Sequence, residues 1–280
     1  MTLSFLLFLA LIGATLGSGK LSPQENLNLQ RLCGAKPINS IAKPNGFQLN
    51  SHRRSLYGGR AITGDMAPWA VQIDTPDLGT CSGTLISPRH ILTASHCVWT
   101  DGSKQSQGVH YSKKECDGYN LILTQNNDLW KVYGSDGRPL SNKVSKMVFM
   151  NYCLQADWRY DDMMIWELQE DVIFNDYVHP ACVLHWQFDN EDRSGTFRLR
   201  DGFMMFIEYT NEGRSFHLNG EKQKTVSRRG DSGSGAFITI DSRFFIVGVY
   251  SGGHTGFDAW YTSVPYHFNF ICQYSGVCWG

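Results

Sequence analysis

The chain lacks an excess of charge of either sign. Its 280 residues include 25 lysines and arginines against 26 aspartates and glutamates, a formal net charge of −1. A nucleic-acid partner favours a basic face, so the composition indicates no nucleic-acid function. The sequence also contains no Asn-x-Ser/Thr sequon, and N-glycosylation is therefore not expected.

Metal-binding patterns are missing as well. No two cysteines stand in a Cys-x-x-Cys spacing, and the nine histidines show no paired ligand spacing. These are the patterns by which structural zinc sites are recognised. We therefore predict no metal and no cofactor.

Long hydrophobic runs are absent except at the start of the chain. The apolar run from Leu3 to Leu11 continues to Gly17 and ends in small residues. This pattern predicts a secretory signal peptide over residues 1–19. The alternative is a membrane anchor, but the run is short for a span and lacks basic flanks. We expect a secreted, extracellular protein without a membrane partner.

The chain does have eight cysteines, 42% apolar residues and 13% aromatic residues. This composition allows a sizeable core, in one large or two small domains. An even number of cysteines behind a signal peptide argues for four disulfides formed in an oxidising compartment.

Two regions of different character follow the signal peptide. Residues 20–55 are polar and contain Pro23, Pro37 and Pro44, which predicts an extended leader or propeptide before a folded domain over 56–280. Short apolar runs rich in β-branched and aromatic residues then alternate with glycine turns, as in all-β barrels or sandwiches. The expected strands are 70–73, 83–87, 90–94, 129–133, 144–150, 163–168, 203–209, 236–240, 244–250 and 259–264. A short C-terminal helix is expected from Pro265 through Ile271.

Residues 230–235 read Gly-Asp-Ser-Gly-Ser-Gly. Glycines permit a tight turn on which the Ser232 hydroxyl is exposed. The same turn can direct the N–H groups of Gly230 and Ser232 into one space, as an oxyanion requires. The alternative is an ordinary surface turn, the usual role of such residues.

Two further stretches carry candidate chemistry. His96 adjoins Cys97, and a Cys81–Cys97 bridge would hold the histidine rigidly. Asp161 and Asp162 come where an apolar strand begins, so one carboxylate is expected at a buried edge, where it needs hydrogen-bond partners. Orienting an imidazole is one such use for Asp162, whereas Asp161 is expected to be a solvated loop carboxylate.

The order His, Asp, Ser resembles the chymotrypsin/trypsin family of serine proteases. Residues 94–97 (Ala-Ser-His-Cys) resemble the family's Ala-Ala-His-Cys, and residues 230–233 resemble its Gly-Asp-Ser-Gly. Residues 162–168 resemble its Asp-Ile-Ala-Leu-Leu-Lys-Leu strand. The likeness runs from about residue 55 to 272, and the leader together with residues 64–69 is similar to a divergent, nematode-type branch.

The resemblance implies two antiparallel six-stranded β-barrels, divided near 169–195, with the catalytic groups between them. It implies Ser232 as nucleophile, His96 as general base and Asp162 as the acid that orients the imidazole. The N–H groups of Gly230 and Ser232 would form the oxyanion hole. A polypeptide substrate, and a protein inhibitor as a further partner, are the partners that the family implies.

The resemblance also places a substrate pocket. Val226 stands where trypsin-like members carry Asp, and Gly253 and Ala259 would line the walls. The pocket therefore should not select Lys or Arg, and we predict an apolar residue before the scissile bond. Ser251 matches the family's serine that hydrogen-bonds the triad acid, the alternative being an ordinary strand-end serine.

Two departures from the family pattern accompany these matches. Ser234 replaces the second glycine after the nucleophile, so different backbone angles are expected in that loop. Arg228 stands where a cysteine normally braces the pocket. Arg228 and Arg229 would favour acidic groups in a substrate or inhibitor, or else are simply solvated.

Disulfides and activation complete the comparison. The resemblance implies the pair Cys81–Cys97 and a leader tether Cys33–Cys182; Cys116–Cys153 and Cys272–Cys278 are assigned by elimination.

Family zymogens are cut before Ile-Val-Gly-Gly, but cleavage after Arg54 would leave Ser55 as the new terminus. Either processing differs or Asp231 finds another cation.

We predict a secreted serine endopeptidase zymogen. The alternative is a catalytically inactive protease homologue that acts as a binding protein, which Ser234 and the missing pocket disulfide favour.

Overall fold

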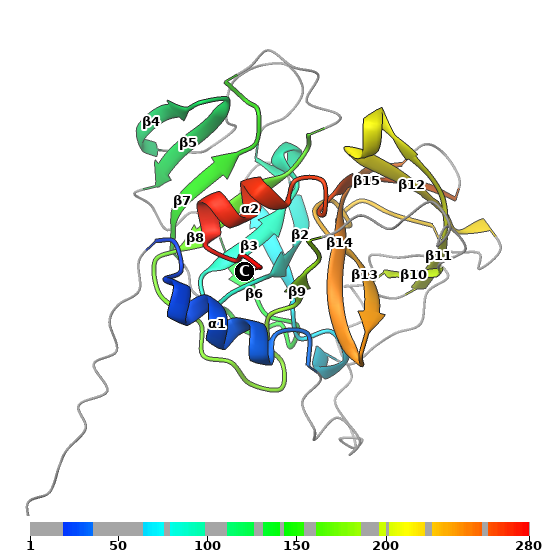
Figure 1. Cartoon of the computed structure of the whole chain (residues 1–280), viewed down its shortest axis with the longest axis horizontal. Helices are drawn as coiled ribbons and strands as arrows, with labels where there is room; N and C mark the ends of the chain where they lie inside the picture. The colour runs from blue at the N-terminus through cyan, green and yellow to red at the C-terminus, as the bar shows by residue number, and fades with distance from the viewer. Residues whose placement is uncertain are drawn as a thin grey trace, which may run out of the picture.

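A computed structural model describes residues 19–35, 64–75, 79–98, 111–125, 131–140, 143–153, 161–185, 196–199, 202–221, 226–253 and 257–279. Residues 1–18 of the signal peptide expected over 1–19, and the cleavage region around Arg54, lie outside these residues. The described chain is mostly β-structure, in two sheets that lie side by side (Figure 1).

The first sheet contains eight strands in the order β4-β5-β7-β8-β3-β2-β1-β6. All of its pairings are antiparallel. Its strands are β1 (Ala70–Thr75), β2 (Gly79–Leu85), β3 (His90–Thr93), β4 (Tyr111–Asp117), β5 (Asn120–Gln125), β6 (Lys131–Tyr133), β7 (Val144–Phe149) and β8 (Met164–Leu168). Its core is formed by apolar side chains that recur along these strands, including Ile73, Leu92, Met147 and Trp166.

The second sheet contains seven strands in the order β13-β10-β11-β12-β15-β14-β9, and β13 also pairs with β14. Its strands are β9 (Cys182–Val183), β10 (Thr196–Leu199), β11 (Gly202–Thr210), β12 (Ser215–Asn219), β13 (Gly235–Ile240), β14 (Arg243–Gly252) and β15 (Asp258–Ser263). The chain passes from the first sheet to the second between β8 and β9. The strand numbers differ from six and six, and β9 pairs with β14 in parallel.

The expected strands are present with shifted ends, but five observed strands are additional to them: β4, β5, β9, β10 and β12. Strand β4 is polar, with Lys113, Lys114 and Glu115 exposed, so it has no apolar run to reveal it, and the apolar run of β5 is only the three residues 121–123. The last helix, α2 (Phe268–Ser275), begins and ends later than expected. It ends before Gly276, whose φ of 74° suits glycine.

The leader is not wholly extended, because residues Pro23–Leu32 form the helix α1. Ser22 caps the helix: its side chain accepts from the Glu25 N–H, and the Glu25 carboxylate accepts from the Ser22 N–H. With proline in the first turn, this is a capping box that the sequence Ser-Pro-Gln-Glu already contains. The expectation of an extended segment from residue 20 is therefore wrong for this part.

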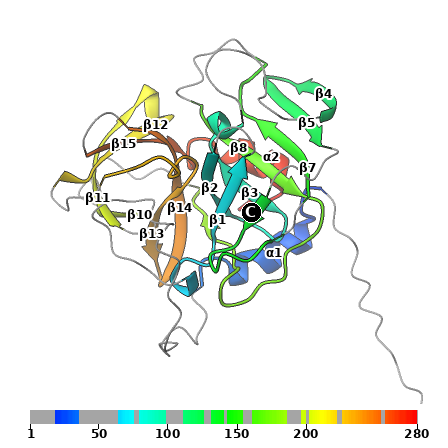
Figure 2. The same ribbon diagram turned by 180° about the vertical axis from the view of Figure 1, so that it is seen from behind.

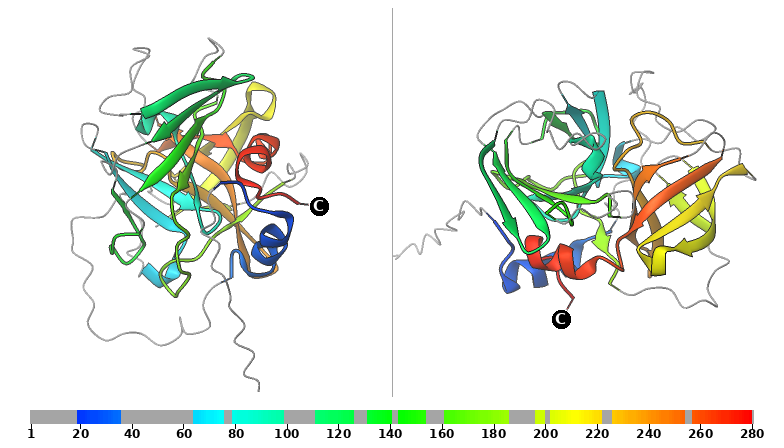
Figure 3. Two further views of the ribbon diagram at one scale, coloured as in Figure 1. Left: turned by 90° about the vertical axis from the view of Figure 1, so that its left-hand side faces the viewer. Right: turned by 90° about the horizontal axis from the view of Figure 1, so that it is seen from above.

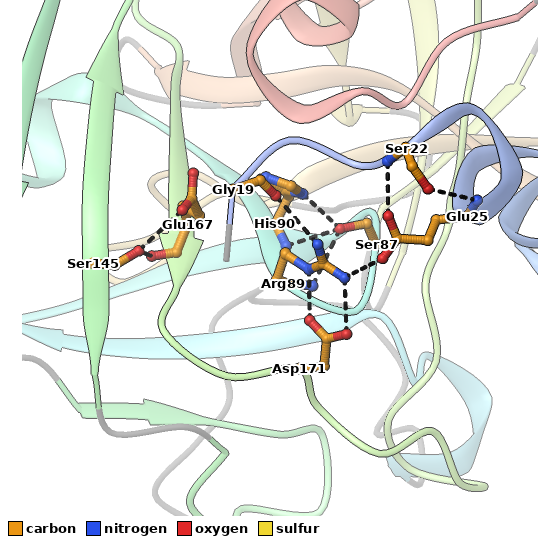
Figure 4. Close-up of polar contacts among 9 residues, drawn as sticks. All are labelled: Gly19, Ser22, Glu25, Ser87, Arg89, His90, Ser145, Glu167 and Asp171. Carbon is orange, nitrogen blue, oxygen red and sulfur yellow. Dashed lines mark hydrogen bonds and ion pairs between the residues drawn. The ribbon is translucent and has the colours of Figure 1, made fainter. Parts of the chain in front are cut away.

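Helix α1 is held against the first sheet by Arg89, which is 3% exposed. The guanidinium makes two hydrogen bonds to Asp171, at 2.6 and 2.9 Å, and a third to Glu25 of α1 (Figure 4). Such a planar fork matches a carboxylate in two contacts at once. The helix is thus a packed part of the fold.

The C-terminal segment lies beside α1, and the two helices share one side of the molecule (Figure 3). The Asn26 side chain accepts from the Cys278 N–H at 3.1 Å and donates to its carbonyl at 2.6 Å. Figure 2, seen from behind, places both helices beyond the first sheet. In the described part of the chain, no helix is long and apolar enough to cross a membrane.

Candidate active site

His96 lies in a single 3₁₀ turn, Ser95–Cys97, directly after β3. Two contacts fix this turn. A disulfide joins Cys97 to Cys81 of β2, and the buried Ser95 hydroxyl donates to the Met163 carbonyl at 2.8 Å. The histidine therefore stands on a rigid corner beside the start of β8.

Strand register brings the acid to the histidine. Strands β3 and β8 are antiparallel, with Thr93 opposite Met164, so the residues after β3 face those before β8. Asp162 is fully buried, and its Oδ2 lies 2.6 Å from His96 Nδ1. Its Oδ1 accepts from the His96 backbone N–H at 2.9 Å. One carboxylate thus holds both the ring and the backbone of one residue.

Ser232 comes from the second sheet, in the loop before β13, and its Oγ lies 2.7 Å from His96 Nε2. The loop is bound to β2 of the first sheet. The Ser82 N–H donates to the Ser232 carbonyl at 2.7 Å, and the Ser82 hydroxyl donates to the Gly230 carbonyl at 2.8 Å. The structure therefore brings Ser232, His96 and Asp162 together in one chain of hydrogen bonds across the two sheets.

Glycine is required at two positions of this loop. Gly230 has φ of 102° and Gly233 has φ of 81°, values that other residues rarely adopt. A Cβ on Gly233 would stand 2.2 Å from the Ser82 carbonyl oxygen. Ser234 has no positive φ, so serine is accommodated where the family carries glycine. The backbone at residue 234 therefore does not require glycine.

The electrostatics of His96 have two opposing causes. Burial disfavours the imidazolium, but the charge of Asp162 and its hydrogen bond favour it more, so the pKa of His96 is raised. A neutral imidazole bonded through Nδ1–H to Asp162 leaves Nε2 free to accept the Ser232 proton. The geometry is that of a hydroxyl activated by a general base.

The proposed oxyanion donors, the N–H groups of Gly230 and Ser232, lie on either side of Asp231. Over the described residues, neither N–H donates to another backbone group. Asp231 is buried and accepts from the Arg228 N–H at 2.7 Å. That bond helps to hold the loop.

Asp161 is not a solvated carboxylate. It is 2% exposed and accepts from the Asn151 side chain at 2.7 Å. It also forms an ion pair with Arg214, at 3.4 Å, and its Oδ1 lies 3.2 Å from His267 Nε2. Since Arg214 precedes β12, the pair connects the second sheet to the residue next to Asp162.

Ser251 does not bond the carboxylate of the triad acid. Its hydroxyl lies 3.0 Å from the hydroxyl of Thr262, which in turn donates to the Asp162 carbonyl at 3.3 Å. Sequence reasoning missed Thr262. The only available signal was its place in β15, where alternation directs it toward the first sheet.

The segments of the predicted pocket meet, because Gly252 of β14 pairs with Trp260 of β15 next to Ala259. Ala259 is fully buried, Val226 is half-buried and Gly253 is exposed. Tyr250, which sequence reasoning did not include, lies among them. Its hydroxyl donates to Ser227 Oγ at 2.7 Å. Arg228 and Arg229 are both exposed, as either interpretation of them allows.

Four disulfides join the pairs that the sequence suggests: Cys33–Cys182, Cys81–Cys97, Cys116–Cys153 and Cys272–Cys278. The first connects the leader to β9, and the third connects β4 to the loop after β7. Among the described residues, no group of three or more His, Cys, Asp or Glu side chains is placed to hold a metal ion.

Two β-sheets that meet at a serine, a histidine and an aspartate define the trypsin-like serine protease class. The chain belongs to the Nematode trypsin-6-like family, whose model matches residues 3–278. It is also similar to the venom serine protease Bi-VSP of Bombus ignitus, with 29% identity over 148 residues, 49% of this chain and 35% of that protein. The proclotting enzyme of Tachypleus tridentatus is 23% identical over 147 residues, 51% of this chain and 36% of that protein. These matches span about a third of the length of either relative.

Proposed function

We propose that the protein is a secreted serine endopeptidase that cleaves peptide bonds through an acyl-enzyme. The observation that carries the proposal is the unbroken hydrogen-bonded chain from Ser232 Oγ through His96 to Asp162. Membership of a trypsin-like family supports a polypeptide substrate. Four disulfides and the apolar start of the chain support secretion.

In the proposed reaction, Ser232 Oγ attacks the peptide carbonyl while its proton passes to His96 Nε2. Asp162 stabilises the resulting imidazolium and keeps the ring in the required tautomer. The oxyanion is placed at the N–H groups of Gly230 and Ser232, each worth roughly 10²–10³ in rate. His96 then returns the proton to the leaving amine, and water hydrolyses the acyl-enzyme by the same steps.

The proposal includes a finer architecture. Strand β13 pairs with both β10 and β14, which makes a ring of six strands with β11, β12 and β15, as a closed barrel requires. We assign the first sheet to a second six-stranded barrel, with β4 and β6 as additions. Residues 1–19 would be removed as signal peptide, and residues 20–55 would remain as a leader before the peptidase domain at 56–280.

A second candidate function is that of an inactive homologue that binds proteins. The observation that favours it is the position of the Tyr250 side chain among the pocket segments. Turnover separates the two candidates, since a binding protein does not need a reactive serine.

A fluorophosphonate probe tests the proposal on the secreted protein. Labelling is expected in the native chain, lost in Ser232→Ala and retained in Ser234→Ala, a matched serine two residues away. If the native protein is not labelled after processing of the leader, the result would instead favour the second candidate, an inactive homologue that binds proteins.

A further inference from the structure

Tyr250 is attached to the nucleophile loop through its backbone. Its N–H donates to the Ser234 carbonyl at 2.8 Å, and its carbonyl accepts from the Gly233 N–H at 2.9 Å. The backbone of Tyr250 is therefore fixed beside the two residues that follow Ser232.

The Tyr250 side chain reaches both predicted walls of the pocket with its hydroxyl. Its hydroxyl bonds Ser227, the neighbour of Val226 at the predicted base. The same hydroxyl lies 3.1 Å from the position that a Cβ on Gly253 would take, so it contacts the two predicted walls where they meet. The ring packs edge-on against buried Tyr261, with ring centroids 5.4 Å apart, and Tyr250 is 6% exposed.

The spacing of the walls leaves no room for a second side chain. A side chain held between two walls needs about 3.5–4 Å to each, so about 7 Å in all. Ser227 Oγ lies only 3.1 Å from the Gly253 Cβ position, and the Asp258 carbonyl oxygen lies 2.4 Å from it. The space is occupied by a residue of the chain itself.

We propose that Tyr250 fills the primary specificity pocket, so that the site accepts only glycine, alanine or serine before the scissile bond. This inference rests on the proposed function. It replaces the expectation of an apolar residue before the scissile bond with that of a small one. Burial raises the pKa of Tyr250, which keeps its hydroxyl a neutral donor to Ser227.

Peptides that differ only in the residue before the scissile bond test the inference. The native protein is expected to cleave after alanine and to discriminate against phenylalanine. Tyr250→Val empties the space and should raise kcat/KM for phenylalanine relative to alanine by about tenfold or more. Tyr250→Phe keeps the ring and should retain the native preference.

Fluorophosphonate labelling distinguishes a failure of the filled-pocket inference from a failure of the proposed endopeptidase function. If Ser232 is labelled but the native protein cleaves after phenylalanine as readily as after alanine, the filled pocket is wrong and the endopeptidase stands. If Ser232 is not labelled, the endopeptidase is wrong.

Indole binding, measured by calorimetry, examines the pocket without turnover. Tyr250→Ala is expected to bind indole, and the native protein is not. Indole binding to the native protein, blocked in the presence of a peptidyl inhibitor, would overturn the inference even if the variant failed to fold.

Discussion

The carboxylate of Asp162 forms two hydrogen bonds with His96, one with the ring Nδ1 and one with the backbone N–H. The buried position of this carboxylate strengthens both contacts, because little water competes for them. The catalytic proposal depends on this relationship, and it leads to a first prediction.

Asp162→Asn should reduce kcat roughly 10⁴-fold, because an amide group facing Nδ1 stabilises the wrong imidazole tautomer. The raised pKa of His96 means that native activity increases as pH rises through a value above its usual 6.5 or so. Without the carboxylate only the effect of burial remains, and the pKa of His96 falls. The residual activity of the variant should therefore increase over a lower pH range than that of the native protein. The pH profile of kcat/KM checks both, and an unchanged profile would contradict the assignment of His96 as general base.

The glycines of the nucleophile loop give a second prediction. Gly233→Ala would place a Cβ against the Ser82 carbonyl and the Thr93 hydroxyl, so fluorophosphonate labelling of Ser232 should be lost. Ser234→Gly should change the labelling rate less than about twofold, because that backbone already suits any residue. Equal labelling of both variants would show that the loop is less constrained than its contacts indicate.

Helix α1 should depend on Asp171 more than on its own Glu25. Asp171→Asn removes the two-contact partner of buried Arg89 and should cost about 2 kcal/mol, less than for a fully buried pair because Asp171 is partly exposed. Glu25→Gln weakens a single contact to Arg89, from a carboxylate about as exposed as Asp171, and should cost at most about 1 kcal/mol. Denaturant unfolding measures both. The reverse order would mean that Arg89 is held mainly by the leader.

His90 should make the protein sensitive to acid. It is fully buried, with Nδ1 2.7 Å from the Ser87 hydroxyl, and burial, aided by the charges of Arg89 and Lys146, lowers its pKa to about 3. The unfolded chain binds a proton near pH 6.5, whereas the folded one does not. Stability is therefore lost as pH falls from about 6.5 toward 3, by up to about 1.4 kcal/mol per pH unit.

His90→Gln provides the comparison, since glutamine does not titrate. The difference in unfolding free energy between native and variant proteins should change between pH 7 and pH 5, and remain constant above pH 7. A difference that stays constant over the whole range would show that His90 is protonated in the fold.

The local chemistry of this protein can be predicted from its sequence. The glycines around Ser232, the cysteine beside His96 and the acid at the head of an apolar strand are each short-range patterns, and their order along the chain indicates the family. The capping box of α1 was equally available, since Ser22 and Glu25 stand three residues apart.

Only the tertiary structure decided the surroundings of those residues. Asp161 is buried because Arg214, 53 residues away, supplies a partner from the other sheet. The Tyr250 hydroxyl bonds Ser227, which lies 23 residues away in the sequence. The burial of a side chain and its contacts depend on which segments, distant in the sequence, meet in the fold, and no local sequence pattern encodes those meetings. The chemical identity of a reactive group, in contrast, is a property of the residue itself.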